Sequence, residues 1–333
     1  MLICSINAVD ETRENKTMIG DKLYGTEYFD LFKLCEGVFA AIENEKHQAG
    51  SNAGIVDLGD FVVVFDSFLD VDAARDLRLA SIKLTGKEPS FVINSHSHSD
   101  HVIGNSMFSK ETRVLSSYKI KELLENEARK DWTSLRERYS KRTKELAEKT
   151  RSEKNPRKLL DYENELLFAR ALMKPDATLR TPDIVFSDSM MFSGRAMMRL
   201  RVYPQAHSEE DIIAWLPELR VCFMGDLLFS HTHPWIGSGD PDRLIMALEE
   251  ILKHQIVTFV PGHGNLATRE DVLDQILYVK ELEELIEKNA DSNKEISIDS
   301  LSPIFRNWRT TAFSWNIDFL RRRFKEKDEE VNH

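Results

Sequence analysis

Cysteine is scarce in this chain of 333 residues, which contains Cys4, Cys35 and Cys222 and no others. Three cysteines far apart in the sequence make neither a disulfide framework nor the paired motif that holds a structural zinc ion. The scarcity excludes small disulfide-stapled folds and cysteine-based zinc fingers. A reducing compartment is therefore the simplest expectation.

Long apolar runs are missing as well. No stretch approaches the roughly 20 apolar residues that a membrane-spanning helix requires. The segment 8–21 is polar and charged, without the apolar core of an export signal. We therefore expect no membrane partner and predict a cytoplasmic protein. The remaining composition, 41% hydrophobic and 30% charged residues, is typical of a soluble globular domain.

Positive charge is not in excess either, because the formal net charge is −11. Proteins that bind nucleic acid need a clustered basic surface to contact phosphates. A local basic excess lies between residues 136 and 158, but no aromatic side chains are interleaved with it as a stripe. We therefore do not expect a nucleic-acid partner and predict a small-molecule substrate instead.

Four side chains that can bind metal, His96, His98, Asp100 and His101, lie within six residues directly after the apolar run 91–94. That run is rich in β-branched and aromatic residues, which predicts a short buried strand ending at the cluster. If the backbone stays extended, His96, His98 and Asp100 point to one side and His101 points to the other. Such a split favours two adjacent metal ions over one.

Three further ligand candidates, His207, Asp226 and His263, each lie just beyond a predicted strand. Strand ends converge at one edge of a sheet, so distant segments can build one site there. Gly225 precedes Asp226 and Gly262 precedes His263, which leaves the backbone free to adopt unusual dihedral angles beside the ligands.

The remaining pattern predicts a β-rich domain interrupted by helices. Residues 119–174 are dense in Lys, Arg and Glu, with apolar residues at helical spacing. We interpret them as an insertion of two or three helices that packs over the domain or forms a dimer contact, and a lid over the site is the functional alternative. A hairpin or two short strands are predicted within 28–42, with a turn at Gly37 before the strand 38–42. The other predicted strands are 55–58, 61–65, 91–94, 114–116, 184–186, 190–192, 197–203, 212–216, 221–224 and 256–260. The other predicted helices are 71–84, 242–253 and 268–288, with one more toward the C-terminus.

Five ordered motifs resemble those of one protein family. They are the segment 50–66, the cluster 94–101 with Gly104 and Asn105 after it, and the segments 205–208, 224–227 and 261–264. On these motifs the sequence is identified as a member of the metallo-β-lactamase superfamily. The resemblance covers most of the chain outside 119–174 and the final helices.

The resemblance implies an α/β fold, an αββα sandwich of two mixed β-sheets with outer helices. We expect residues 20–333 to form a single metallo-β-lactamase-like domain, with 119–174 as a helical insertion and 1–20 as an N-terminal extension. A homodimer stays open as an alternative to a monomer.

The resemblance also implies a ligand set for two ions. His96, His98 and His207 would hold the first ion, Asp100, His101 and His263 the second, and Asp226 would bridge them. Neutral imidazoles and carboxylates suit zinc, so two zinc ions per chain are the expected cofactors, with iron or manganese as alternatives. Asp66 would lie behind the ligands, although a turn residue at the end of a strand or a helix N-cap is a serious alternative role for it.

The expected activity is hydrolysis of an ester, lactone, thioester or amide-like bond by a metal-bound hydroxide, which Asp100 could orient. One alternative is a phosphodiesterase or nuclease of the same fold, and another is an iron-dependent enzyme resembling persulfide dioxygenases. His98 disfavours the flavodiiron branch, which has Glu there. β-Lactam turnover is expected to be weak or absent.

Several other residues have less specific interpretations. Asp211 is expected to hold the loop of His207, or to be a solvated turn residue. His231 and His233 are expected on a loop at the rim of the site rather than as ligands. Cys222 is expected in the core. His47, His254 and His333 are isolated histidines with no expected metal role.

Overall fold

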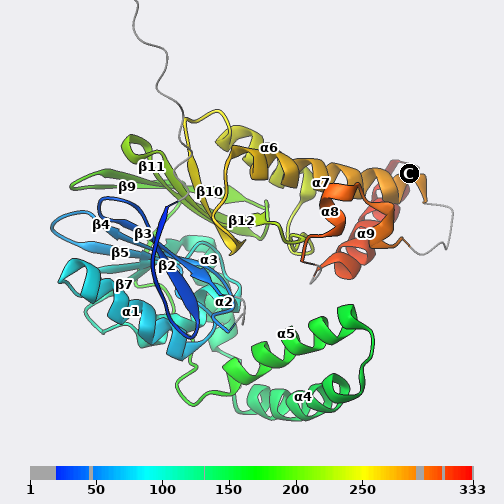
Figure 1. Ribbon diagram of the computed structural model, residues 1–333, viewed down its shortest axis with the longest axis horizontal. Coiled ribbons are helices and arrows are strands. Elements are labelled where there is room, and N and C mark those ends of the chain that lie inside the picture. The colour runs from blue at the N-terminus through cyan, green and yellow to red at the C-terminus, as the bar shows by residue number, and fades with distance from the viewer. Residues whose placement is uncertain (1–19, 45–47, 131, 290–295, 310–311, 332–333) are drawn as a thin grey trace, which may run out of the picture.

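The chain folds into two β-sheets packed face to face, with helices on the outer sides (Figure 1). The computed structural model describes residues 20–44, 48–130, 132–289, 296–309 and 312–331. The predicted αββα sandwich is therefore confirmed. The predicted N-terminal extension, Cys4, His47 and His333 lie outside the described residues, apart from Gly20.

The first sheet contains eight strands that follow one another in chain order. Neighbouring strands are antiparallel from the first to the fifth and parallel from the fifth to the eighth. The carboxyl ends of the parallel strands therefore meet at one edge. The strands are β1 (Asp21–Gly25), β2 (Phe29–Cys35), β3 (Val38–Glu43), β4 (Ala53–Asp57), β5 (Val62–Phe65), β6 (Phe91–Ile93), β7 (Arg113–Ser117) and β8 (Ile184–Phe186).

The second sheet contains five strands in the order β13-β12-β11-β10-β9. Its strands are β9 (Ser189–Ser193), β10 (Met197–Pro204), β11 (Glu210–Leu216), β12 (Val221–Ser230) and β13 (Thr258–Gly264). The β12–β13 pair is parallel and the others are antiparallel. β12 and β13 are longer than predicted, since they continue past residues 224 and 260.

The helices are α1 (Val71–Thr85), α2 (Ser99–Val102), α3 (Tyr118–Ala128), α4 (Trp132–Ser152), α5 (Pro156–Met173), α6 (Pro241–Ile251), α7 (Arg269–Lys288), α8 (Pro303–Arg306) and α9 (Phe313–Val331), with short 3-10 turns at Ile103–Met107, Pro217–Leu219 and Ile298–Ser300. The boundaries of α1 follow from its caps: the Asp70 carboxylate accepts from two first-turn N–H groups, and Gly86 ends the helix in the left-handed region. None of the described helices is long and apolar enough to cross a membrane.

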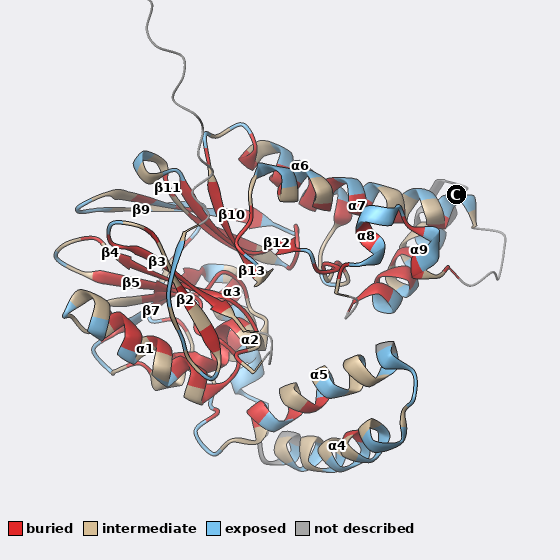
Figure 2. Cartoon of the chain, in the orientation of Figure 1, coloured by how far each residue is buried: buried red, intermediate tan, exposed pale blue. Residues whose placement is uncertain are grey.

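The core has three layers of apolar packing. Inner-face residues of both sheets form the central cluster, where Phe65 of the first sheet lies against Phe223 of the second, with ring centroids 5.7 Å apart. A second cluster joins the outer face of the first sheet to α1, and the third joins β12 to α6, α7 and α9. Figure 2 shows the buried residues concentrated along the strands and on the inner sides of these helices.

Helices α4 and α5 form a hairpin that extends below the sandwich in Figure 1. At its base, the Lys174 ammonium lies 2.7 Å from both Asp70 and Asp72, and the Arg136 guanidinium donates to the carbonyls of Pro175 and Ala177. Apolar residues at the end of α5 pack against Leu69 and Ile103. The hairpin is thus anchored at one end. Its status as an insertion with bounds 119–174 stays a prediction.

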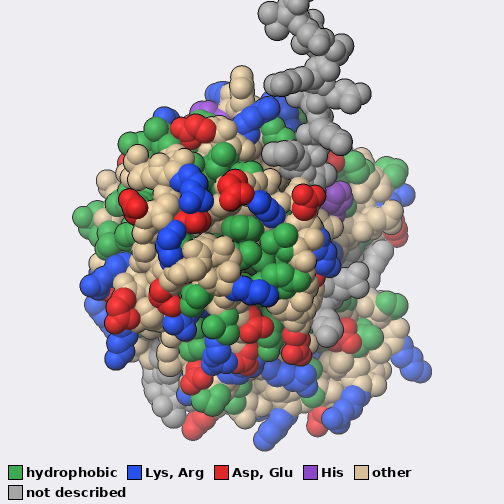
Figure 3. Space-filling view, turned by 60° about the vertical axis from the view of Figure 1, so that its left-hand side comes forward, with side chains coloured by type: hydrophobic (Ala, Val, Ile, Leu, Met, Phe, Trp, Pro, Cys, Tyr) green, Lys and Arg blue, Asp and Glu red, His purple; other side chains and the backbone are tan. Residues whose placement is uncertain are grey.

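The surface drawn in Figure 3 mixes acidic and basic side chains, and no continuous basic stripe crosses that face. Such a mixed surface offers no extended contact for a phosphate backbone. It agrees with the acidic net charge of the sequence.

Candidate metal centre

The candidate ligands converge from four segments of the two sheets. The cluster follows β6, His207 follows β10, Asp226 lies within β12 and His263 lies within β13. The prediction that Asp226 and His263 lie in loops beyond their strands is wrong, because the parallel pairing of β12 and β13 continues with irregular register to Ser230 and Gly264.

The backbone of the cluster is not extended. His98 is the N-cap of α2, and Asp100 and His101 lie inside this short helix. The predicted alternation, with Asp100 beside His96 and His98 and with His101 opposite, is therefore wrong. Helix formation instead places Asp100 and His101 together.

Two groups of donor atoms result. The first group comprises His96, His98, His207 and Asp226, and the second comprises Asp100, His101 and His263. Within each group the donor atoms lie within 4.8 Å of one another, close enough to hold one ion. The seven residues are the seven predicted metal ligands, and their assignment as ligands stays a proposal.

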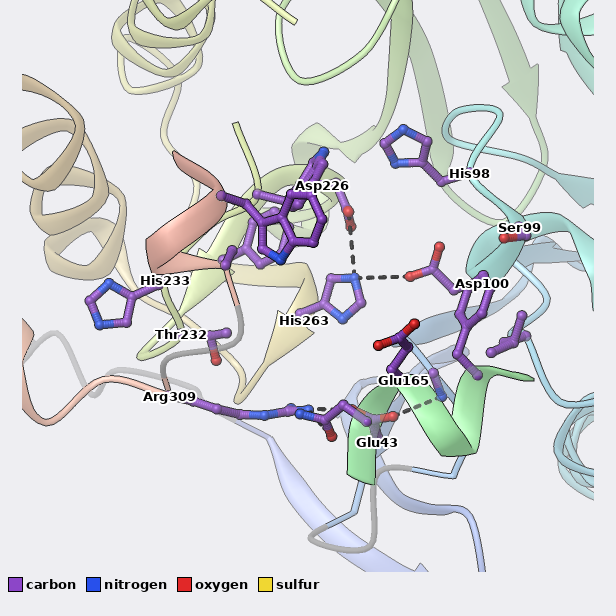
Figure 4. A pocket seen from close by; sticks show the side chains of 18 of the residues that line it. Glu43, His98, Ser99, Asp100, Glu165, Asp226, Thr232, His233, His263 and Arg309 are labelled. Atoms are coloured by element: carbon purple, nitrogen blue, oxygen red, sulfur yellow. Dashed lines mark hydrogen bonds and ion pairs between the residues drawn. The ribbon is translucent and has the colours of Figure 1, made fainter. Parts of the chain in front are cut away.

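The Asp226 carboxylate lies between the two groups. Figure 4 shows His263 between Asp226 and Asp100, with His98 on the far side of Asp226. From Asp226 Oδ2 the distances are 3.7 Å to His96 Nε2, 3.3 Å to His207 Nε2 and 3.4 Å to His263 Nε2, and from Asp226 Oδ1 the distance to His101 Nε2 is 3.1 Å. One carboxylate therefore faces an imidazole nitrogen from each group, which is the geometry of a bridging ligand.

His96 Nε2, His101 Nε2 and Asp226 Oδ1 are buried and make no hydrogen bond of good geometry among the described residues, although the last two face each other at 3.1 Å. Leaving a buried polar atom unsatisfied costs about 1–3 kcal/mol, so native folds rarely accumulate such atoms without a ligand. All three belong to residues of the two donor groups. The donor set therefore fits divalent metal ions such as zinc.

The imidazoles of the first group favour the neutral form. Burial lowers the pKa of His207 to about 3. Burial also lowers the pKa of His96 well below its usual value, and His101 and His98 lower it further. Neutral imidazoles are the form that binds metal.

The second group has the opposite balance. Burial lowers the pKa of His263, but the carboxylates of Asp226 and Asp100 outweigh it and raise the pKa to about 9. His101 behaves in the same way, since Asp226 and Asp66 overcome burial and raise its pKa well above the usual value. The electrostatics of this group therefore favour the protonated imidazoles, opposite to those of the first group.

Two buried carboxylates support the ligands from behind. Asp66 lies 2.8 Å from His101 Nδ1 and accepts the Ser95 N–H, and its φ of 60° turns the backbone toward the cluster. Asp66 caps no helix; Asp70 does so instead. Asp211 accepts hydrogen bonds from the N–H groups of His207 and Ser208. Of its two predicted roles, it therefore has the one of holding the His207 loop.

Buried amide side chains hold the same segments. Asn52, Asn94 and Asn105 lie within the motifs of the family resemblance, but the sequence predicts no role for them. Asn52 donates to the carbonyls of Pro261 and Gly264 on either side of His263. Gln275 accepts the Phe229 N–H and donates to the Leu227 carbonyl, beside Asp226. Asn94 and Asn105 bond to each other, and Asn94 also donates to the His101 carbonyl. Gln275 lies outside every motif, and for all four amides the hydrogen-bond partners are shown by the fold alone.

Two glycines allow the close approach of these segments. Gly225 has a φ of 51°, and a Cβ there would lie 2.6 Å from the Ser95 Cβ. A Cβ on Gly262 would collide with Asp226 Oδ1. Larger residues at either position would displace the central carboxylate.

A cavity of about 650 Å³ opens above the donor atoms. Its polar walls include the Glu43–Arg309 pair, at 3.6 Å, and Asn164, which lies 3.4 Å from the same guanidinium. Its apolar walls include Phe168 of α5, with Trp235 and Trp315, whose ring centroids are 5.9 Å apart. Helix α5 therefore lines the cavity, and residues distant in sequence complete it.

The remaining predicted residues lie outside both donor groups. His231 is largely exposed, whereas His233 is buried and its Nδ1 lies 2.7 Å from the Tyr278 hydroxyl. In Figure 4, His233 is directed away from His263. Cys222 is buried in β12 as expected, and His254 stacks on Trp215 with centroids 4.1 Å apart.

The model of the family described as the metallo-beta-lactamase superfamily matches residues 48–263, more than half of the chain and all seven candidate ligands. The chain belongs to this superfamily.

Solved metallo-β-lactamase structures support the fold. The metallo-beta-lactamase from Pontibacter korlensis has 16% identity and a TM-score of 0.53 over 76% of this chain and 99% of that chain. A structure of TMB-1 has 14% identity and a TM-score of 0.54 over 77% of this chain and 98% of that chain. No curated protein matches the sequence. The superfamily resemblance predicted from the ordered motifs is confirmed.

Proposed function

We propose that the chain is a dinuclear zinc-dependent hydrolase of a small molecule that contains an ester, lactone, thioester or amide-like bond. The observation that carries the proposal is the Asp226 carboxylate between two donor groups, each able to hold one ion. His96, His98 and His207 would hold one zinc ion, Asp100, His101 and His263 the other, and Asp226 would contact both. Bound zinc would act as a Lewis acid that lowers the pKa of a coordinated water and polarises the scissile bond.

Asp100 is the residue best placed to move a proton. It lines the cavity, with a side chain 20% exposed, and its Oδ2 lies 3.3 Å from His263 Nε2. Burial favours the neutral acid, but His101 and His263 outweigh burial and hold the pKa of Asp100 below its usual value. An ionised Asp100 can accept a proton from the attacking water at a carboxylate oxygen.

The cavity supports a small substrate over a polyanion. Its volume of about 650 Å³ lies within the roughly 300–1,000 Å³ typical of small-molecule sites. Glu43, Asp161 and Glu165 line it, whereas Arg309 already contacts Glu43. Glu165 is likewise paired with Arg142, and the one Lys or Arg among the described lining residues, Arg309, is engaged by Glu43. The described part of the cavity therefore offers a phosphodiester no uncommitted lysine or arginine, and the hydrolysis of neutral bonds is favoured over nuclease activity.

A hydrolysis screen of zinc-loaded protein tests the proposal. The substrates are lactones, thioesters, carboxylic esters, phosphodiesters, sulfate esters and penicillin, with metal content measured by mass spectrometry on the same sample. We expect two zinc ions per chain and turnover in the first three classes, with weak or no penicillin turnover. One iron per chain and oxygen-dependent turnover of a persulfide would instead support the dioxygenase alternative and overturn the proposal.

A further inference from the structure

The orientation of His207 depends on a main-chain carbonyl. His207 Nδ1 lies 2.9 Å from the Trp235 carbonyl oxygen. A carbonyl oxygen can only accept, so Nδ1 carries the proton and Nε2 presents its lone pair. His207 Nε2 is the atom that lies 3.3 Å from Asp226 Oδ2 in the first donor group. The Trp235 carbonyl therefore selects the tautomer and ring direction that metal binding requires.

The position of that carbonyl is fixed by one side chain from the C-terminal helix. Asn316 of α9 is fully buried. Its Oδ1 accepts the Ile236 N–H at 3.1 Å, and its Nδ2 donates to the Pro234 carbonyl at 2.6 Å. These two residues flank Trp235 directly. Asn316 also bonds to the Tyr278 hydroxyl, whose other partner is His233 of the same loop.

An asparagine is the residue type that this position requires. One bond needs an acceptor and the other needs a donor, and the amide supplies both from adjacent atoms. A carboxylate could accept the Ile236 N–H, but it would place an oxygen against the Pro234 carbonyl. Helix α9 lies outside residues 48–263, the part of the chain that the family model matches.

We propose that Asn316 is a positioning residue that orients His207 through the Trp235 carbonyl, so that α9 is part of the metal centre. This inference rests on the proposed metal centre and concerns the first donor group alone. The described side-chain contacts of Asn316 are with Pro234, Ile236 and Tyr278, and none of them is with Asp100, His101 or His263. Loss of Asn316 should therefore weaken zinc binding at the first donor group and leave zinc binding at the second unchanged.

The experiment measures zinc affinity in two backgrounds, without substrate. His263→Ala disables the second group and leaves the first, whereas His98→Ala disables the first and leaves the second. Asn316→Asp is placed in each background, and zinc affinity is measured with a chromophoric chelator as competitor. We expect binding about 10-fold weaker in the His263→Ala background, the lower end of the effect of removing a supporting partner of a ligand, and unchanged binding in the His98→Ala background. Cobalt substitution should show an altered absorption spectrum in the first case only.

Thr112→Val is the matched control. Thr112 is fully buried and its hydroxyl donates to the Pro89 carbonyl at 2.7 Å, at the opposite end of β6 from the cluster. This variant loses a buried hydrogen bond without touching the His207 loop, and both affinities should stay as in the parent.

Asn316→Ser, which buries no charge, replaces Asn316→Asp if the latter does not fold. An equal loss in both backgrounds shows a general structural role and overturns the proposal, as does an unchanged first-group affinity in a folded variant. Because no hydrolysis is measured, failure of the proposed activity leaves this test intact.

Discussion

The two donor groups share a carboxylate but differ in the protonation state that their surroundings favour for the imidazoles. The first group is dominated by burial, so His96 and His207 stay neutral. The second lies among the carboxylates of Asp66, Asp100 and Asp226, which raise the pKa of His101 and His263. Similar residue types a few ångströms apart thus have pKa values shifted in opposite directions. The difference teaches that the number of carboxylates in direct contact with a ring, more than its depth of burial, sets the direction of the shift here.

Removal of the shared carboxylate should impair metal binding at both groups and have the largest effect. Asp226→Asn leaves four imidazole nitrogens without their common anionic partner. We expect loss of bound zinc and a fall in kcat/KM of about a thousandfold or more, since metal assistance contributes several kcal/mol to catalysis. Metal content and steady-state kinetics measure the effect. His254→Ala, which removes an imidazole outside both groups, is the control, and two retained ions with full activity in Asp226→Asn would contradict the assignment.

The pH dependence of zinc binding should separate the groups next. Below the His263 pKa of about 9, the proton competes with zinc for the ring nitrogen. In His98→Ala protein, zinc affinity should therefore rise with pH by at least about tenfold per unit up to pH 9, with at least one proton released. In His263→Ala protein the affinity should be flat between pH 7 and 9, because the His207 pKa is about 3. Calorimetry in buffers of different ionisation enthalpy counts the protons, and equal release in both proteins would refute the contrast.

Asp66→Asn should weaken the second group selectively. The Asp66 carboxylate lies 2.8 Å from His101 Nδ1 and fixes the ring. Loss of such a partner typically lowers metal affinity about 10–100-fold. The measurement is zinc competition in the His98→Ala background, with the His263→Ala background as the control. A larger loss of affinity in the control would show that Asp66 supports the first group instead, and would contradict the prediction.

Asp211→Asn should have the smallest effect. Asp211 bonds to the main-chain N–H of His207 rather than to its ring, so the ring keeps its bond to the Trp235 carbonyl. We expect zinc affinity of the first group to fall by less than about tenfold, below the range for direct partners of a ligand ring. The same competition assay in the His263→Ala background checks this. The prediction is contradicted if Asp211→Asn lowers the zinc affinity of the first group more than Asp66→Asn lowers that of the second.

The sequence allowed prediction of the fold and of the seven candidate ligands, because ordered motifs and strand periodicity are local signals. It failed where geometry depends on tertiary pairing. The extended-backbone argument separated Asp100 from His101, whereas a short helix joins them. Asp226 and His263 were expected in loops, but the parallel pairing of β12 and β13 draws both into strands.

Residues that support the ligands were the least predictable. Asn52, Gln275 and Asn316 are single amides that bond to main-chain atoms 46 or more positions away, at Pro261, Phe229 and Pro234. Asn52 lies in a predicted motif and the other two do not, and the role of all three comes from bonds to main-chain atoms of another segment. Asp66 was identified as a supporting residue only as one of two alternatives, because an aspartate after a strand is equally typical of a helix cap.

The cavity walls and the donor atoms belong to different pieces of the chain. Phe168 comes from α5, and Arg309 and Trp315 come from the C-terminal region, whereas no candidate ligand does. A side-chain replacement in these walls changes which molecule fits and leaves the ligand residues in place. Changes at Phe168 or Trp315 can therefore alter which molecule fits the cavity without replacing any of the seven candidate ligands.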